Sequence, residues 1–156
     1  MQNRRQMMTR SAQVAAMLAA VGLLPGPAHA QAAGGYNSVA FTAKTMAELM
    51  KALGSAAPSE SKDVTLTGPD IAENGAVVPI GAASALPAVK RLLILVEKNP
   101  AMLAAMFDIT DAIDANISTR VKMGQSSNVF AVAMMNDGKV LFAQKEVKVT
   151  LGGCGG

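Results

Sequence analysis

The only cysteine of this 156-residue chain, Cys154, lies between Gly152-Gly153 and Gly155-Gly156. A single cysteine cannot form an internal disulfide, and an odd cysteine in an exported protein indicates intermolecular pairing or a reactive thiol. An ordinary thiol has a pKa of about 8.5, so about 3% of it is thiolate at pH 7. The nearest cation in the sequence, Lys148, is six residues away. We therefore expect a thiol that its own neighbours do not activate.

The glycines around Cys154 predict a mobile arm over residues 151–156, because glycine imposes few limits on the backbone. If the last strand ends near Thr150, four residues lead to the thiol, which then reaches about 13–14 Å at ~3.3–3.6 Å per residue. Gly155 and Gly156 leave the tip slim enough for a narrow cleft. A mobile, slender and unactivated thiol suits a covalent carrier on which other enzymes act, whereas an incidental exposed cysteine would be a liability in an oxidising compartment.

Other side chains offer little chemistry. Asp108, Asp111 and Asp114 recur at a spacing of three, but calcium loops need carboxylates at alternate positions and a glycine at the turn. A solvated acidic loop is the better interpretation. The only histidine is His29, so a transition-metal site or a Ser-His-Asp triad has almost no material. We expect no metal and no cofactor.

The N-terminus has the composition of a secretory signal peptide. Arg4-Arg5 precede an apolar stretch over residues 12–24, and Ala28-His29-Ala30 forms an A-x-A site. We expect cleavage between Ala30 and Gln31. The apolar stretch has 13 residues, against the roughly 20 that span a bilayer, so no membrane anchor is predicted. The paired arginines favour the twin-arginine route, and export predicts a periplasmic protein.

Cleavage removes the excess of positive charge. Three of the 14 Lys and Arg residues lie in residues 1–30, which leaves 11 basic against 11 acidic residues in 31–156. The mature chain is formally neutral, and its composition gives no reason to expect nucleic-acid binding.

One helix is predicted near the start of the mature chain. Thr45 and Glu48 have the spacing of a capping box, and Gly54 is a natural C-terminal stop. The apolar positions between them have helical spacing: Met46, Leu49, Met50 and Leu53. This stripe is predicted to pack on the chain's own core, with a groove for a partner as the alternative.

The period then changes from 3.6 to 2. Residues 63–67 alternate, Gly68-Pro69 predicts a turn, and Asn74-Gly75 predicts a hairpin before the next strand. Pro79 in that strand indicates a sheet edge or a bulge. Residues 73–83 carry no charge after the first residue and are predicted to form an edge hairpin, with a docking surface as the alternative.

The rest of the chain predicts more strands. Residues 91–98 are apolar at both parities, and 101–109 fit helix or strand, with the flanking strands favouring strand. Residues 117–123 alternate. Residues 128–135 lead to a turn at 136–138, after which the chain returns antiparallel. About seven short strands predict an all-β sandwich over residues 31–150.

Two strands of this sandwich are apolar on both faces, "RLLILV" and "NVFAVAMM". Antiparallel sheets in small domains usually keep one polar face. The second face must therefore be covered, either by a protein partner, which the short helix favours, or by the helix and loops. Phe142 is the informative position if Leu141 faces the core.

Four stretches resemble the SoxY family of sulfur carriers from the periplasmic thiosulfate-oxidising Sox system: the twin-arginine leader, "AKTMAELMKALG", "IAENGAVVPI" and "GGCGG". The resemblance implies an immunoglobulin-like antiparallel sandwich that pairs with a SoxZ subunit. It implies that a c-type cytochrome enzyme links thiosulfate to Cys154, that a hydrolase releases sulfate, and that a sulfane dehydrogenase acts where present. The chain would then be a carrier and not itself an enzyme.

Two other classes remain as alternatives. Ubiquitin-like carriers also use a C-terminal Gly-Gly, but they are cytoplasmic β-grasp proteins, which the leader disfavours. An exported structural or adhesion sandwich would use Cys154 for an intermolecular disulfide. The predicted organisation is a signal peptide over 1–30, a sandwich over 31–150 and a carrier arm over 151–156.

Overall fold

The computed structural model describes residues 37–150. This part of the chain contains one 3-10 turn, one α-helix and nine strands. Their bounds are η1 Ala40–Thr42, α2 Met46–Ala52, β1 Ser59–Glu60, β2 Val64–Thr67, β3 Ile71–Ala72, β4 Val78–Ser84, β5 Val89–Val96, β6 Leu103–Asp108, β7 Asn116–Val121, β8 Ser127–Met135 and β9 Val140–Val149. The all-β prediction is confirmed, and the two strands beyond the predicted seven are the two-residue strands β1 and β3.

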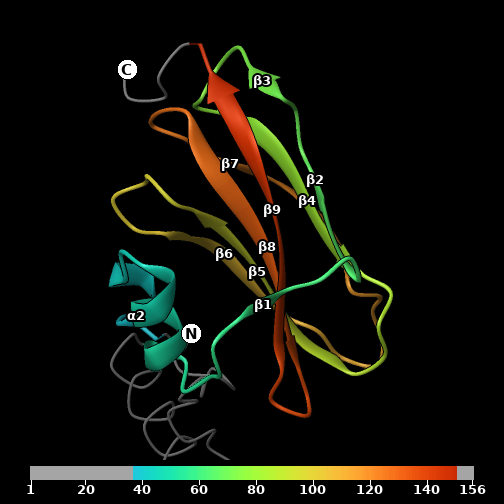
Figure 1. The fold of residues 1–156 in the computed structure, drawn as a ribbon. Coiled ribbons are helices and arrows are strands. Elements are labelled where there is room, and N and C mark those ends of the chain that lie inside the picture. The colour runs from blue at the N-terminus through green and yellow to red at the C-terminus, as the bar shows by residue number, and fades with distance from the viewer. Residues whose placement is uncertain (1–36, 151–156) are drawn as a thin grey trace, which may run out of the picture. The chain divides into compact units, whose positions relative to one another are not determined.

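The strands form two sheets (Figure 1). The larger has the order β1-β9-β8-β5-β6, with β3 also paired to β9, and the smaller has the order β2-β4-β7. Most neighbours are antiparallel, as predicted, but β1 and β3 run parallel to β9. Between them the chain crosses to the smaller sheet to form β2. The outer edge of β9 is thus covered near both ends by short strands, which limits unwanted strand pairing.

Hydrophobic clusters lie on both faces of the larger sheet. Along β5, Leu92, Leu93, Ile94 and Leu95 are all fully buried. Successive side chains of a strand point to opposite faces, so both faces of the sheet are covered here. Leu92 and Ile94 pack between the two sheets. Leu93 and Leu95 pack on the other face, against a cluster that includes residues of η1 and α2.

The second face is therefore covered, at its centre, by elements of this chain. Leu49 and Met50 of α2 are buried against Leu93 and Val132, which confirms that the helical stripe packs on its own core. The expectation that a partner covers these positions is wrong. The helix is too short to cover them alone, but the 3-10 turn adds Ala40 to the same hydrophobic cluster. Other hydrophobic side chains of this face stay only half-buried: Phe41, Met106, Phe130, Met134 and Phe142.

The helix begins and ends as its sequence predicts. The Glu48 backbone N–H donates to Thr45 Oγ1 at 3.2 Å, and Glu48 Oε2 accepts from the Lys44 N–H at 2.9 Å. Gly54 has φ +63, and the Ser55 N–H donates to Met50 O at 2.9 Å. This is the Schellman pattern, in which a left-handed residue after the helix satisfies the last carbonyls.

The predicted hairpin at Asn74-Gly75 is wrong. The strand before it, β3, pairs with β9, and the strand after it, β4, pairs with β2 and β7. A type I′ hairpin needs positive φ at both turn residues, and within residues 37–150 only Gly54, Ala88 and Gly138 have it. Asn74 instead accepts the Ala76 N–H on its side chain at 2.8 Å. The turn carries the chain from one sheet to the other.

Pro79 is predicted to lie on an edge strand. This is wrong for β4 as a whole, but it is correct for the part of β4 that contains Pro79. β4 is the middle strand of its sheet. However, β2 pairs only with Gly81–Ser84, so at Pro79 the strand has β7 alone as a neighbour. A proline has no N–H to donate, and here none is needed.

Within residues 37–150, no helix is long and apolar enough to span a membrane.

Candidate functional site

The residues predicted to carry the chemistry lie outside the described residues. They are the attachment residue Cys154, the arm glycines Gly152, Gly153, Gly155 and Gly156, and the cleavage positions Ala30 and Gln31. Their roles stay predictions. The structure describes the chain up to Thr150, four positions before the cysteine, and so it describes the root from which the predicted arm starts.

On one side, the end of β9 is held by β8 and the residue before it. The pairing between the two strands ends where Val147 faces Ser127. Two residues beyond Val147, the Val149 N–H donates to the side-chain Oγ of Ser126 at 2.9 Å. A side chain thus holds β9 where strand pairing has already stopped.

On the other side, the end of β9 is held by β3 and its flanking residues. The Lys148 N–H donates to Asp70 O at 2.9 Å, and the Thr150 N–H donates to Ala72 O at 3.1 Å. The Thr150 hydroxyl donates to Glu73 O at 3.1 Å. Three bonds to one short segment therefore continue the ladder up to the last described residue.

This segment is itself fixed at both ends. Lys145 Nζ donates to Gly68 O at 2.6 Å and forms an ion pair with Asp70 Oδ1 at 2.9 Å. Ala72 is buried in the core between the sheets. Beyond it, Gly75 O accepts the Met123 N–H at 2.7 Å. We name Asp70–Glu73, Ser126 and Lys145 the β9 clamp.

The ion pair in the β9 clamp changes the acidity of its carboxylate. A hydrogen bond from Lys145, and then its positive charge, hold the pKa of Asp70 below the ordinary value of 3.8. The carboxylate is fully exposed, so solvent screens this attraction strongly. The ion pair therefore orients the segment more than it stabilises the fold.

The three aspartates singled out by their spacing have different surroundings. Asp108 Oδ1 accepts a hydrogen bond from Arg91 Nε at 2.6 Å, across the β5–β6 pair. Asp111 and Asp114 are exposed, and neither takes part in an ion pair within the described chain. The solvated interpretation is confirmed for these two, while Asp108 is paired.

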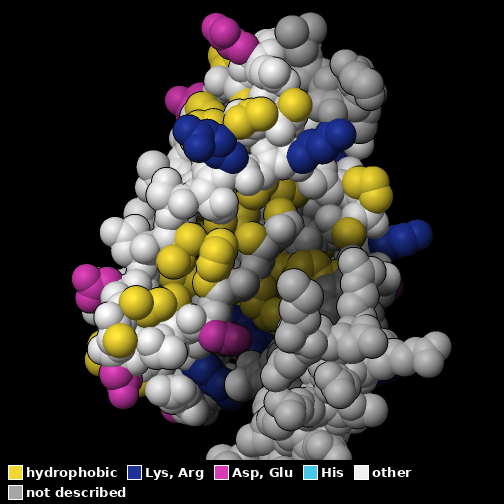
Figure 2. Space-filling model, turned by 180° about the vertical axis from the view of Figure 1, so that it is seen from behind, with side chains coloured by type: hydrophobic (Ala, Val, Ile, Leu, Met, Phe, Trp, Pro, Cys, Tyr) yellow, Lys and Arg dark blue, Asp and Glu magenta, His cyan; other side chains and the backbone are white. Residues whose placement is uncertain are grey.

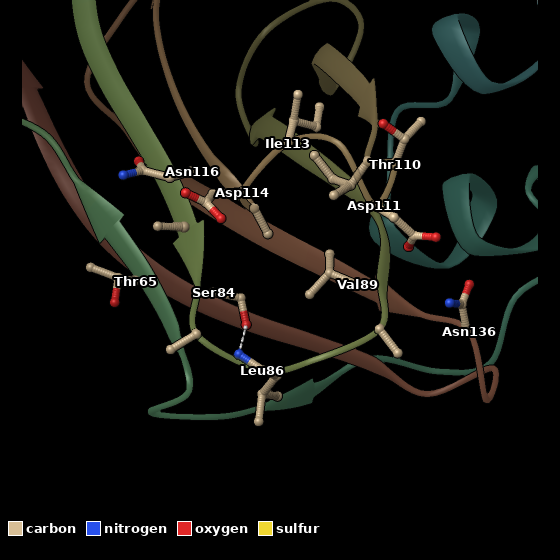
Figure 3. A pocket seen from close by; sticks show the side chains of 15 residues that line it. Thr65, Ser84, Leu86, Val89, Thr110, Asp111, Ile113, Asp114, Asn116 and Asn136 are labelled. Carbon is tan, nitrogen blue, oxygen red and sulfur yellow. Dashed lines mark hydrogen bonds between the residues drawn. The ribbon is translucent and has the colours of Figure 1, made fainter.

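Asp111 and Asp114 line a cavity of about 550 Å³ (Figure 3). It lies among the β4–β5 and β6–β7 loops, Asn136 and adjoining residues of β2, β4, β5 and β7, and Figure 3 shows Asp114 and Val89 among the side chains that line it. Asn136 belongs to the turn before β9, so the cavity lies at the opposite end of β9 from Thr150.

The distance from this cavity to Thr150 can be compared with the length of the predicted arm. β9 has ten residues, which at ~3.3 Å per residue separate its two ends by about 30 Å. The predicted arm reaches about 13–14 Å from its root. The predicted arm is therefore too short to bring a thiol at position 154 to this cavity.

A smaller groove, of about 320 Å³, lies on the helix-covered face of the larger sheet. Phe130, Phe142 and Met102 form its apolar wall, and Lys44 and Glu97 lie at its margin. The two phenylalanine rings are tilted by 60° with centroids 5.9 Å apart. This groove is the part of the second face that η1 and α2 leave partly open.

Sequence reasoning missed the β9 clamp. Asp70, Ser126, Lys145 and Thr150 belong to no motif, and the bond from Thr150 to Glu73 joins residues 77 positions apart. The sequence predicts β9 as a strand, but nothing in it indicates that a two-residue strand pairs with β9 in parallel. No group of three His, Cys, Asp or Glu side chains that could hold a metal occurs between residues 37 and 150.

Comparisons with known proteins identify what the chain is similar to. The family described as "Sulfur oxidation protein SoxY" matches residues 49–154. Among solved structures, the sulfur carrier protein SoxY from Chlorobium limicola f thiosulfatophilum is 31% identical, with a TM-score of 0.61 over 69% of this chain and 97% of that one.

A second solved structure shares only the fold. A superoxide reductase (neelaredoxin) from Ignicoccus hospitalis is 12% identical, with a TM-score of 0.50 over 55% of this chain and 78% of that one. A comparison with curated protein sequences gives no significant match.

Proposed function

The chain belongs to the SoxY family of sulfur oxidation proteins, and on this premise we propose that Cys154 is the residue to which substrate sulfur is covalently attached. As a member of the family, the chain is a sulfur carrier of the Sox system. One observation carries the finer proposal: the family match extends through residue 154, so it includes the chain's only cysteine.

The described residues support a delivery role for the segment that follows β9. The strand runs from the sandwich core to Thr150, where the β9 clamp holds it. Four residues then lead to Cys154, a reach of about 13–14 Å. The thiol would visit the active sites of partner enzymes, since the cavity of its own domain is too far away.

The chemistry would be supplied by those enzymes. The Cys154 thiolate and thiosulfate together give up two electrons to a c-type cytochrome enzyme and form Cys–S–S–SO3⁻. A hydrolase then adds water across the S–SO3 bond, which releases sulfate and leaves a persulfide on the cysteine. A sulfane dehydrogenase oxidises the remaining sulfur where it is present, and a last hydrolysis restores the thiol.

A SoxZ-like subunit is the proposed stable partner. The groove walled by Phe130, Phe142 and Met102 offers an apolar surface that η1 and α2 do not fully cover. An apolar groove of this kind is typical of an interaction site. Seen from behind (Figure 2), the molecule also has hydrophobic side chains gathered near the middle, with most charged side chains around them. The leader over residues 1–30 places the complex, in this proposal, in the periplasm.

Mass spectrometry of the tail peptide tests the attachment. The native mature chain, incubated with thiosulfate and the oxidising enzyme, should gain a thiosulfate-derived adduct on Cys154 that reducing agents remove. Cys154→Ser should gain none and should keep its fold and its partner. Thiosulfate oxidation supported by Cys154→Ser, or adducts on other residues, would refute the proposal. A disulfide between two chains as the only modification would favour the structural alternative.

A further inference from the structure

The clearest built feature outside the strands themselves is the β9 clamp, and its contacts are concentrated on three residues. Lys148, Val149 and Thr150 follow the last β8–β9 pair, and each donates its backbone N–H to the clamp. β3 pairs with no other strand in the described chain. Apart from burying Ala72 in the core, this two-residue strand pairs only with the end of β9, which indicates a role at that place.

We propose that the β9 clamp sets the length of the carrier arm by fixing its root at Thr150. This inference rests on the proposed function of Cys154. With the clamp closed, the predicted arm would consist of residues 151–154 up to the thiol. With the clamp open, β8 still holds β9 up to Val147, and the free arm would begin at Lys148.

The difference in reach is large. Four residues span about 13–14 Å, whereas seven residues span about 23–25 Å, at ~3.3–3.6 Å per residue. The effective concentration of a tethered group falls roughly as the −3/2 power of tether length. Lengthening the arm from four to seven residues therefore lowers the concentration of the thiol at a docked active site about two-fold.

The clamp also decides which side chains the arm carries. Residues 152 and 153 are glycines, but Lys148, Val149 and Thr150 bear bulky side chains. Held on the sheet, these three stay out of a partner's cleft. Thr150, Ser126 and Asp70 are thus positioning residues, which act on the reaction only through the place of the thiol.

The test combines three substitutions that remove side-chain contacts and leave the core untouched: Thr150→Val, Ser126→Ala and Asp70→Asn. The matched control makes the same chemical changes elsewhere, with Thr67→Val, Ser118→Ala and Asp137→Asn. Asp137 is a fair counterpart because it too is exposed and pairs with a lysine at 2.9 Å. Both variants are studied as the full mature chain with its partner subunit.

Two measurements report on the clamp. Hydrogen exchange at the amides of Lys148, Val149 and Thr150 should accelerate in the clamp variant and stay native in the control. The backbone bonds from Lys148 to Asp70 O and from Thr150 to Ala72 O remain in this variant, so the clamp is weakened and not abolished. With the oxidising enzyme, kcat should therefore fall by up to about two-fold while KM stays unchanged, because docking of the body is intact and only delivery of the thiol is diluted. The rate of thiol labelling by a small reagent should not change.

An insertion provides a second variant that leaves the clamp intact. Three glycines added after Thr150 also give an arm of seven residues, so kcat should again fall about two-fold, with native exchange at residues 148–150. Native kcat in the insertion variant, or unchanged exchange at residues 148–150 in the clamp variant, would overturn the inference, as would accelerated exchange there without any fall in kcat. If Cys154→Ser remains active, the carrier proposal itself fails. If Cys154 is required but arm length has no effect, only the role of the clamp fails.

Discussion

Leu141 and Phe142 are neighbours on β9, and they face opposite sides of the larger sheet. Leu141 packs against the core between the two sheets, whereas Phe142 packs with Phe130 on the face that carries α2. The condition that made Phe142 an informative position is therefore met. A change at Phe142 alters the outer face and leaves the sandwich core in place.

Phe142→Glu should abolish binding of the partner subunit while the domain still folds. The new carboxylate would lie next to Glu60, which pairs with Phe142 in the β1–β9 register, and would charge the apolar groove. Because the ring is half-buried, we expect a loss of roughly 1–2 kcal/mol in unfolding free energy. Size-exclusion chromatography of the mixed subunits and a urea titration measure the two effects. Ile113→Glu, at a residue 50% exposed in the β6–β7 loop, is the control. Native complex formation by Phe142→Glu would rule out this groove as the binding site of the partner.

Gly152→Pro combined with Gly153→Pro should separate the chemistry of the thiol from its delivery. Proline fixes φ and stiffens an extended segment, so turnover with the enzymes should slow. The thiol should still react with a small reagent as fast as in the native chain. Parallel rates for both reactions, whether native or reduced, would show that backbone freedom at these glycines is not needed for delivery.

The Asp70–Lys145 ion pair should make a small part of the stability depend on pH. The pKa of Asp70 is lower in the folded chain than its ordinary value of 3.8. The associated stability is therefore present above that value and is lost as pH falls through the folded pKa. The melting temperature of the native chain should exceed that of Asp70→Asn at pH 6, and the two should converge once the pH lies below the lowered pKa of Asp70 in the folded chain. A difference that persists at the lowest pH would contradict the assignment.

Gly54→Ala should loosen α2. At φ +63 an added Cβ meets no atom within 4 Å, so the cost is conformational only, about 1–2 kcal/mol for a residue that is not glycine. Urea titration measures it, and faster hydrogen exchange at the Ser55 amide should localise it. Gly54→Asn serves as the control, because asparagine tolerates the left-handed region better, and its loss should be smaller.

The mature exported protein should begin at Gln31. Ala28-His29-Ala30 forms the predicted cleavage site, and N-terminal sequencing of periplasmic material tests it. Arg4→Lys with Arg5→Lys should leave the uncleaved precursor in the cytoplasm if export uses the twin-arginine route. Normal export of that variant would indicate the general secretory route.

Local chemistry made several elements predictable. The capping box and Gly54 predict α2 to within a residue, and the turn at 136–138 closes with the Gly138 N–H bonded to Met135 O at 3.1 Å. Alternation over 117–123 predicts which side chains of β7 are buried. Each of these signals arises within about ten residues, where the periodicity of helix or strand acts directly.

Features that depend on distant partners were not predictable. The period of β5 shows that both faces are buried, but it does not indicate that η1 and α2 cover Leu93. Asn74-Gly75 favours a hairpin locally, yet β3 pairs with β9, and β4 pairs with β2 and β7. The β9 clamp joins residues 77 positions apart, and only the assembled sheets bring them together. The prediction of an arm over residues 151–156 rests only on the glycines around Cys154.

The place of β9 in the larger sheet has a consequence for biosynthesis. β9 lies between β8 on one side and β1 and β3 on the other, so neither hydrophobic cluster is complete without it. Synthesis runs from the N-terminus, and β9 is therefore made after the other eight strands, with Cys154 only five residues behind Val149. Ribosomes that stop early release chains that lack both the strand and the thiol. In the proposed function, this limits the number of folded sandwiches that could bind the partner subunit without a cysteine to load.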